Sequence, residues 1–182
     1  MEAFIIPLLL FRYVMTYNEN TKKVNGNQVF IVEDDDMHSL MMDYMLSKDT
    51  VAHIKKFKSG EECVSNLDKN PDVVILDYGL PGINGMQTLL QIKKQAPEIP
   101  VIVVTGNKNK ELERDFYSAG VYDYIPKDEN AFEQVSRLTS SILNIIAAKE
   151  AKEEHRRHVL LSIGVMVAIS LIGILTWVMM RH

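Results

Sequence analysis

The 182-residue sequence lacks the features that mark several protein classes. Its single cysteine, Cys63, excludes an internal disulfide, so nothing indicates an oxidising compartment. Its formal net charge is −4, so the chain lacks the basic excess that nucleic-acid binding usually requires. No segment repeats, and none is of low complexity. We therefore expect one ordinary domain with extra segments that binds no nucleic acid, with Cys63 as a small buried or half-buried side chain.

One long hydrophobic run is present, Val159 to Met180, which is 22 residues without a charge. As a helix it would be about 33 Å long, enough to cross a hydrocarbon layer of about 30 Å. Its hydroxyl residues can return hydrogen bonds to the helix backbone, and Trp177 lies near the far end, where interfacial aromatics belong. A buried core helix of this length would need a second core around it. The run therefore predicts a single membrane span.

The flanks of this run predict its orientation. Four Lys or Arg residues precede the span: Lys149, Lys152, Arg156 and Arg157. One, Arg181, follows it. Such an imbalance keeps the basic side in the cytoplasm. We expect a tail-anchored protein with its chemistry on the cytoplasmic side, a juxtamembrane helical linker at 149–158, the span at 159–180 and a short tail at 181–182.

The first 24 residues form a separate segment. Residues 3–11 are apolar, but the run is too short to span and Pro7 interrupts it. Glu2 stands where a signal peptide would carry basic residues. We expect a disordered or weakly interfacial extension, and Met15 offers an alternative start before the polar leader of the domain.

Apolar runs of strand length alternate with helical patterns between residues 25 and 148. The predicted strands are 28–32, 50–57, 73–76, 101–104 and 122–125, and the more polar 50–57 is expected at a sheet edge. The helices are predicted to begin near residues 36, 61, 85, 112 and 129. Five alternating strand and helix units predict a doubly wound five-stranded parallel sheet covered on both faces.

Apolar residues three and four positions apart predict the buried faces of the helices. In the first helix the predicted buried residues are Met37, Leu40, Met41, Tyr44 and Met45, which favours core over binding surface. In the helix that begins at residue 85 they are Met86, Leu89, Leu90 and Ile92, and in the last helix Phe132, Val135, Leu138, Ile142 and Ile145.

Side chains that can bind ions or take part in a reaction follow four of the predicted strands. Glu33 and Asp34 follow the first, Asp77 the third, Thr105 the fourth and Lys127 the fifth. In an open parallel sheet, functional groups gather outside the carboxyl ends of the strands. Three carboxylates, one hydroxyl and one ammonium group are therefore expected to converge on one crevice.

These residue types favour phosphoryl transfer. Clustered carboxylates repel one another unless a cation lies among them, and hard oxygen ligands favour Mg²⁺. A carboxylate such as Asp77, once neutralised by a metal, can attack phosphorus and form an aspartyl phosphate. Thr105 and Lys127 can then bind the phosphoryl oxygens, and Gly79 can offer its carbonyl to the metal.

The runs IVEDD, LDYGLPGINGM, VIVVTG and DYIPKD, in this order, resemble the receiver domain of bacterial two-component response regulators of the CheY-like superfamily. The resemblance covers about 120 residues, roughly two thirds of the chain. It implies a flavodoxin-like receiver domain over residues 25–148. It also implies that Asp77 accepts the phosphoryl group, that Asp34 binds Mg²⁺ directly, that Glu33 does so through water, and that Gly79 adds a backbone carbonyl.

The resemblance further implies a switch. Thr105 would move to meet the phosphoryl group, Lys127 would pair with it, and Tyr124 would be the aromatic side chain that turns inward on activation. Two positions depart from the common family pattern. Gly106 stands where many receivers have alanine, and Asp128 stands where many have a proline in a cis peptide, so the bond after Lys127 is left open as cis or trans.

The implied partners are a sensor histidine kinase or phosphotransfer protein and an unknown downstream protein. The implied location is the cytoplasmic face of the bacterial inner membrane. Because the sequence leaves no room after the receiver for a DNA-binding or enzymatic output domain, we expect no enzymatic activity beyond phosphotransfer to Asp77 itself. Output is then expected from the surface near Thr105 and Tyr124. Gly164 and Ala168 form a small-residue pair that can support a homodimer of spans.

Two alternatives stay open from the sequence. One is a membrane adaptor that keeps the receiver fold and signals without phosphorylation, against which the intact acids argue. The other is an aspartate-nucleophile phosphohydrolase of the haloacid dehalogenase type. Such an enzyme needs a second acid two positions after its nucleophile, and here that position is Gly79.

Overall fold

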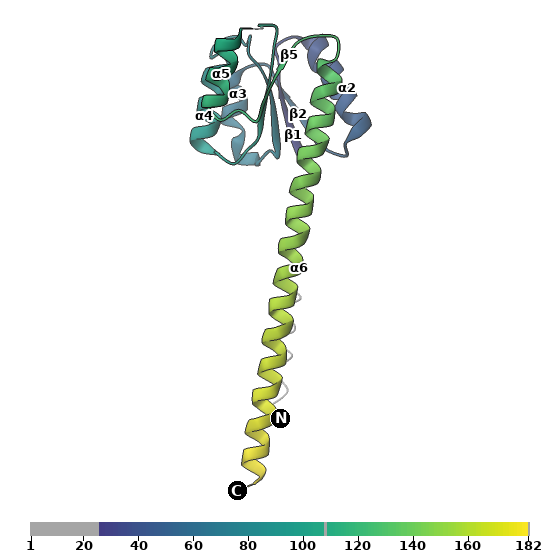
Figure 1. The fold of residues 1–182 in the computed structure, drawn as a ribbon, viewed down its shortest axis with the longest axis vertical. Helices are drawn as coiled ribbons and strands as arrows, with labels where there is room; N and C mark the ends of the chain where they lie inside the picture. Colours follow the sequence, from purple (N-terminus) through teal and green to yellow (C-terminus); the bar gives the residue numbers. More distant parts are fainter. Residues whose placement is uncertain (1–25, 108, 182) are drawn as a thin grey trace.

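The structure is a computed structural model that describes residues 26–107 and 109–181. The predicted N-terminal extension, residues 1–24, lies outside the described residues. An α/β domain at one end continues into a single long helix (Figure 1).

Five parallel strands form one sheet in the order β2-β1-β3-β4-β5. The strands are β1 (Gln28–Val32), β2 (His53–Phe57), β3 (Val73–Asp77), β4 (Val101–Thr105) and β5 (Asp123–Pro126). β1, β3 and β4 are buried along their whole length, as expected for continuous apolar runs in a parallel sheet. β2 is the more exposed edge strand, as predicted, although it begins at residue 53 and not at residue 50.

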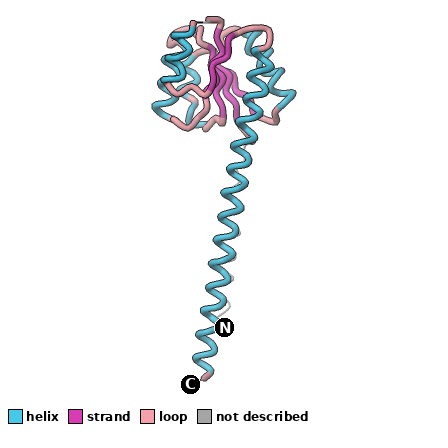
Figure 2. Tube along the Cα trace, viewed as in Figure 1, coloured by secondary structure: helices cyan, strands magenta, loops and turns pink. Residues whose placement is uncertain are grey.

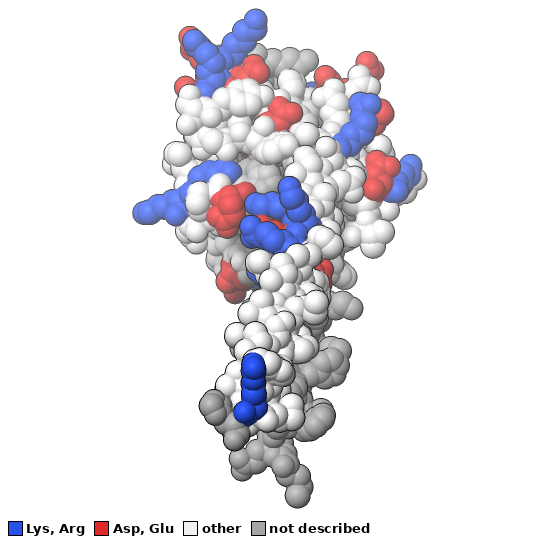
Figure 3. All heavy atoms as spheres, turned by 60° about the horizontal axis from the view of Figure 1, so that its bottom comes forward, with Lys and Arg blue, Asp and Glu red and all other residues white. Residues whose placement is uncertain are grey.

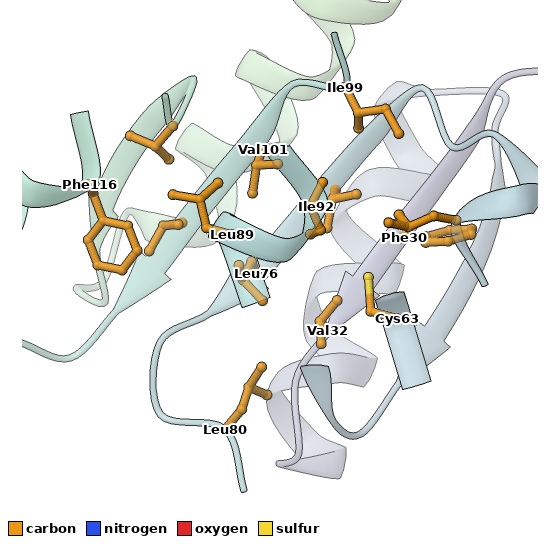
Figure 4. Packing of buried hydrophobic residues seen from close by; sticks show 14 of the residues in the cluster. Phe30, Val32, Cys63, Leu76, Leu80, Leu89, Ile92, Ile99, Val101 and Phe116 are labelled. Atoms are coloured by element: carbon orange, nitrogen blue, oxygen red, sulfur yellow. The ribbon is translucent and has the colours of Figure 1, made fainter. Parts of the chain in front are cut away.

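Helices cover both faces of the sheet (Figure 2). They are α2 (Asp36–Asp49), α3 (Gly60–Ser65), α4 (Gly85–Gln95), α5 (Lys110–Ser118) and α6 (Ala131–Met180), and a short 3₁₀ turn, Leu67–Lys69, follows α3. One core cluster joins the sheet to α3, α4 and α5, and the second joins it to α2 and α6. Figure 4 shows the first cluster, in which Cys63 packs beside Phe30 and Val32. The doubly wound parallel fold predicted from the sequence is confirmed.

The predicted buried face of the first helix is wrong. In α2 the buried residues are Ser39, Met42 and Leu46, which pack toward the sheet and α6. Met37, Leu40, Met41 and Tyr44, predicted to be core, are exposed, and Met45 is half-buried. The buried face begins with a serine, so hydropathy alone selected the other side of the helix.

Two further core assignments are wrong. Leu90 in α4 is 52% exposed and Ile145 in α6 is 59% exposed. Hydroxyl residues take inward positions instead: Thr88 in α4, and Ser136 and Thr139 in α6. All three side chains are fully buried. Phe132 and Leu138 are only partly buried, at the margin of the second cluster. Leu89, Ile92, Val135 and Ile142 are buried as predicted, so each of these two faces was predicted correctly in part.

The last helix, α6, runs without a break from the α/β domain through the apolar run. It starts just after β5, at the carboxyl edge of the sheet, and passes back along the sheet in contact with α2, β3 and β5. It leaves at the opposite edge, where Ile146 and Lys149 border Pro71 and Pro100. Its most apolar stretch has a mean hydropathy of 2.6 and no buried residue, so α6 is long and apolar enough to cross a membrane.

Candidate functional site

The acidic residues are placed by the ends of two neighbouring strands. β1 and β3 pair in register, with Val32 beside Leu76, so the residues that follow them lie side by side. The side chain of Asp35 then accepts a hydrogen bond from the backbone N–H of His38 at 2.8 Å and caps α2. This cap starts the helix immediately after the strand and holds Glu33 and Asp34 at the carboxyl edge of the sheet.

Glu33, Asp34 and Asp77 form an acidic cluster. Each offers a carboxylate oxygen, and the three oxygens lie within 4.8 Å of one another. Glu33 and Asp77 are buried, whereas Asp34 is exposed. Burial raises the pKa of Glu33, and the charge of Asp77 adds to this effect. A cluster of hard oxygen donors that is open on one side fits Mg²⁺, which keeps several waters of its own.

Lys127, which follows the edge strand β5, completes this cluster. Its Nζ lies 2.8 Å from Oε2 of Glu33 and 3.1 Å from Oδ2 of Asp77. Burial alone would lower the pKa of Lys127, but the hydrogen bond to Glu33 and the charge of Asp77 raise it above its usual value. No peptide bond in the described residues is cis, so the bond to Asp128 is trans.

Thr105 is the last residue of β4 and Tyr124 is the second residue of β5, and both contact the loop that follows β4. The Oγ1 of Thr105 accepts a hydrogen bond from the backbone N–H of Asn107 at 3.0 Å. The hydroxyl of Tyr124 donates to the carbonyl of the same residue, Asn107. The Tyr124 ring is turned inward against Phe116, with 5.6 Å between ring centroids, and burial raises the pKa of Tyr124. The side chains of Thr105 and Tyr124 therefore both hydrogen-bond to the backbone of one loop residue, Asn107.

The loop between β3 and α4 forms the wall of the site beside Asp77. A Cβ on Gly79 would lie 3.6 Å from Oδ2 of Asp77, so this residue borders the carboxylate. The carboxylate of Glu61, at the start of α3, accepts a hydrogen bond from the backbone N–H of Ile83 at 2.9 Å and so ties α3 to the loop. Sequence reasoning missed Glu61, because no pattern reveals a contact across 22 positions.

Several known proteins are similar to this chain. The DNA-binding transcriptional regulator NtrC of Salmonella typhimurium is 30% identical over 115 residues, which are 63% of this chain and 24% of NtrC. The probable C4-dicarboxylate response regulator DctR of Bacillus subtilis is 35% identical over 102 residues, 55% of this chain and 45% of DctR. The chain thus spans less than half the length of these two curated relatives.

Two solved structures resemble the domain as well. The BeF₃-activated receiver domain of DrrB superposes with a TM-score of 0.60 at 26% identity, over 65% of this chain and 98% of that one. A putative response regulator from Chloroflexus aurantiacus superposes with a TM-score of 0.58 at 28% identity, over 65% and 98% of the two chains.

The five-stranded parallel sheet with helices on both faces is a flavodoxin-like fold, and the acidic cluster lies at its carboxyl edge. The sequence pattern of the response regulator receiver domain matches residues 29–139, more than half of the chain. The chain therefore belongs to the response regulator receiver family of two-component systems. Receiver domains are signalling modules that interact with histidine kinases or phosphotransfer proteins, and some relatives add enzymatic output domains to theirs.

Mg²⁺ is expected to stabilise the folded protein through the acidic cluster. At ten times its dissociation constant it should add about 1.4 kcal/mol, which would raise the melting temperature of the receiver by about 5 °C. Differential scanning fluorimetry of the protein in detergent would measure this shift, with NaCl at the same ionic strength as control. An equal shift with NaCl would mean that screening, and not binding at the cluster, is the cause.

Replacing Lys127 by methionine is expected to destabilise the metal-free protein by about 2 kcal/mol at pH 7.5, because two buried carboxylates lose their cation. The pKa of Glu33 is already raised, and losing the hydrogen bond from Lys127 should raise it further. An acid with a raised folded-state pKa costs stability as pH rises through that pKa. The deficit should therefore shrink toward pH 5. Urea unfolding in a chelator would test this, and an equal deficit at both pH values would point to lost packing only.

Proposed function

We propose that this protein is a membrane-tethered receiver that accepts a phosphoryl group on Asp77 in a Mg²⁺-dependent reaction. The observation that carries the proposal is the convergence of three carboxylates and Lys127, whose Nζ lies 3.1 Å from the Asp77 carboxylate. The domain limits proposed for it remain those read from the sequence: a receiver at 25–148, a linker at 149–158, a span at 159–180 and a two-residue tail.

Asp77 is the nucleophile of the proposed reaction. Its carboxylate oxygen attacks the phosphorus of a phosphohistidine or a small acyl phosphate, the bond from phosphorus to the donor breaks, and an acyl phosphate forms. Asp34 would hold Mg²⁺ directly, Glu33 would do so through water, and Asp77 and the Gly79 carbonyl would complete the protein ligands. When bound, the ion supplies positive charge to the phosphoryl oxygens. Lys127 is near enough to exchange its contact with Asp77 for one with the phosphoryl group.

The proposed switch follows from the shared loop residue. The Oγ1 of Thr105 accepts a hydrogen bond from the backbone N–H of Asn107, so a movement of Thr105 toward the phosphoryl group would pull on this loop or break the bond. The carbonyl of Asn107 also accepts the hydrogen bond of Tyr124, so a movement of the loop is coupled to the aromatic ring. Phosphorylation would thus favour one of two arrangements of the surface formed by α5, β5 and α6. This surface is where we propose that a downstream protein docks.

The exposed apolar face of α2 supports a protein as the phosphate donor. Met37, Leu40, Met41 and Tyr44 are between 42% and 65% exposed, and they lie on the helix that starts beside the acidic cluster. Exposed apolar patches of this kind mark protein interaction sites. We infer that a sensor histidine kinase or phosphotransfer protein covers this face while its phosphohistidine reaches Asp77.

Membrane attachment would place the site at the far end of the molecule from the bilayer. α6 begins at the carboxyl edge of the sheet, and Ala131 is 28 residues before Val159, so about 42 Å of helix separates the site from the span. The basic residues before the span support a cytoplasmic location for the receiver. A homodimer through Gly164 and Ala168 stays a prediction of the sequence pattern.

The test is phosphorylation of the full-length protein in detergent. Acetyl phosphate or carbamoyl phosphate with Mg²⁺ should add the mass of one phosphoryl group, and a chelator should prevent the addition. Peptide mapping after borohydride reduction should place the modification at Asp77. A folded protein that gains no mass and binds no fluoroberyllate would favour the phosphorylation-independent adaptor.

A further inference from the structure

A groove runs along α6 between the receiver and the apolar run. It is formed by α6 alone and is open to solvent, and its lining residues, all exposed, are Lys149, Lys152, Glu153, His155, Arg156, Val159 and Leu160. Three of these side chains are permanent cations and one is an acid. Figure 3 shows basic side chains gathered where the helix leaves the domain, above a stretch of surface without Lys, Arg, Asp or Glu. The groove therefore combines a basic upper part with an apolar lower part.

The basic residues of the groove share one face of the helix. At about 100° per residue, Lys149, Lys152 and Arg156 fall within an arc of about 60°. Arg157 lies about 100° away from Arg156, on the side that also carries Glu154. None of the three groove cations forms an ion pair with a described residue, so their charge is available to an external anion.

The depth of the groove matches the lipid headgroup layer if Val159 begins the span. The layer is about 5 to 8 Å thick on each side of the hydrocarbon. Arg156 stands about 4.5 Å above Val159 along the helix, within this layer, and Lys152 stands about 10.5 Å above it, close enough to reach the layer with its long side chain. Lys149 is higher, but it lies within about one screening length of the layer. Val159 and Leu160 would lie at the level of the first acyl carbons.

We propose that this face of α6 binds an anionic phospholipid, with its phosphate between Lys152 and Arg156 and its acyl chain against Val159 and Leu160. The inference rests on the proposed membrane span. Because α6 is one unbroken helix that also packs in the receiver, a lipid held on one face of the helix would favour one rotation of the receiver relative to the membrane.

The structure offers a matched pair of variants for the test. Arg156→Gln and Arg157→Gln each remove one positive charge at almost the same depth, but only Arg156 lines the groove. The full-length protein would be reconstituted in phosphatidylcholine vesicles that contain spin-labelled phosphatidylglycerol or spin-labelled phosphatidylcholine. Electron paramagnetic resonance gives the preference of the protein for the anionic label over the neutral one.

Arg156→Gln is expected to lower this preference about fivefold, the effect of one basic residue near a charged surface. Arg157→Gln should lower it less than twofold. Equal losses in the two variants would overturn the proposal, because they would show a general attraction to charge without a site on one face. Carbonate extraction separates this failure from that of the span: a protein released by carbonate overturns both inferences, whereas an inserted protein with equal losses overturns only the lipid site.

Discussion

Replacing Asp77 by asparagine is expected to abolish phosphorylation by acetyl phosphate, with a loss of at least a thousandfold in the rate of mass gain. The amide keeps the shape of the side chain but lacks the negative oxygen that must attack phosphorus. The amide oxygen can still accept a hydrogen bond from Lys127, whose Nζ lies 3.1 Å from the native carboxylate. We therefore expect the variant to fold. Because one charge leaves the acidic cluster, its metal-free stability at pH 7.5 should equal or exceed that of the wild type by up to about 1 kcal/mol.

The matched control is Asp36→Asn. Asp36 is the first residue of α2, three positions after Glu33, and it pairs with Lys58 and not with the acidic cluster. This variant should keep the full mass gain and the full stabilisation by Mg²⁺, whereas Asp77→Asn should lose both. Intact mass spectrometry and thermal unfolding measure the two properties on the same samples. A mass gain that persists in Asp77→Asn would move the phosphorylation site to another residue.

The sheet and the position of the acids could be predicted because each depends on a strong local signal. β1, β3 and β4 are continuous apolar runs, and such runs in alternation with helices form buried parallel strands. Parallel strands bring all their carboxyl ends to one edge. The proximity of Glu33, Asp77 and Lys127 then follows from the order of the strands, and their distances in the structure agree with it.

The helix faces could be predicted only in part, because hydroxyl side chains take some of the core positions: Leu89, Ile92, Val135 and Ile142 are buried as predicted, but the face predicted for α2 is wrong. Ser136 is fully buried, and its Oγ donates to Oδ2 of Asp49 at 2.6 Å and lies 3.1 Å from the carbonyl oxygen of Met45. These contacts join α6 to α2. A buried serine with a partner costs little, but hydropathy places it on the surface. Ser39 misled the prediction for α2 in the same way.

The arrangement of Thr105 and Tyr124, the two proposed switch residues, also lay beyond sequence reasoning. A tyrosine at position 124 is compatible with an inward or an outward ring. The choice depends on contacts with Phe116 and with the carbonyl of Asn107, which are far away in the chain. The same limit applies to Glu61, whose carboxylate holds the loop beside Asp77 at the backbone of Ile83. Glu61, Phe116 and Asn107 help to position the site, but they belong to none of the four sequence motifs that locate it.

Replacing Gly85 by alanine is expected to damage both the fold and the site. A Cβ at this position would lie 2.6 Å from the carbonyl oxygen of Asp77 and 2.6 Å from the Cα of Tyr78. Both are backbone atoms, so the clash cannot be relieved by a change of rotamer. The backbone N–H of Gly85 also donates to the carbonyl of Tyr78 at 3.0 Å, so α4 must start in close contact with the end of β3. We expect a loss of about 3 kcal/mol in the free energy of unfolding, even after the helix preference of alanine is counted.

A methyl group added at Gly106 provides the control, because, apart from its two neighbours in the chain, no atom of the described residues lies within 4 Å of a Cβ built there. Gly106→Ala should change the free energy of unfolding by less than about 0.5 kcal/mol. Urea unfolding compares the two variants, and phosphorylation by acetyl phosphate should slow at least tenfold in Gly85→Ala only, since displacement of the Asp77 backbone moves its carboxylate away from Lys127. A Gly85→Ala protein with wild-type stability would mean that the start of α4 can move away from β3. The close contact between Gly85 and the backbone of Asp77 and Tyr78 would then not be needed to hold the Asp77 carboxylate in place.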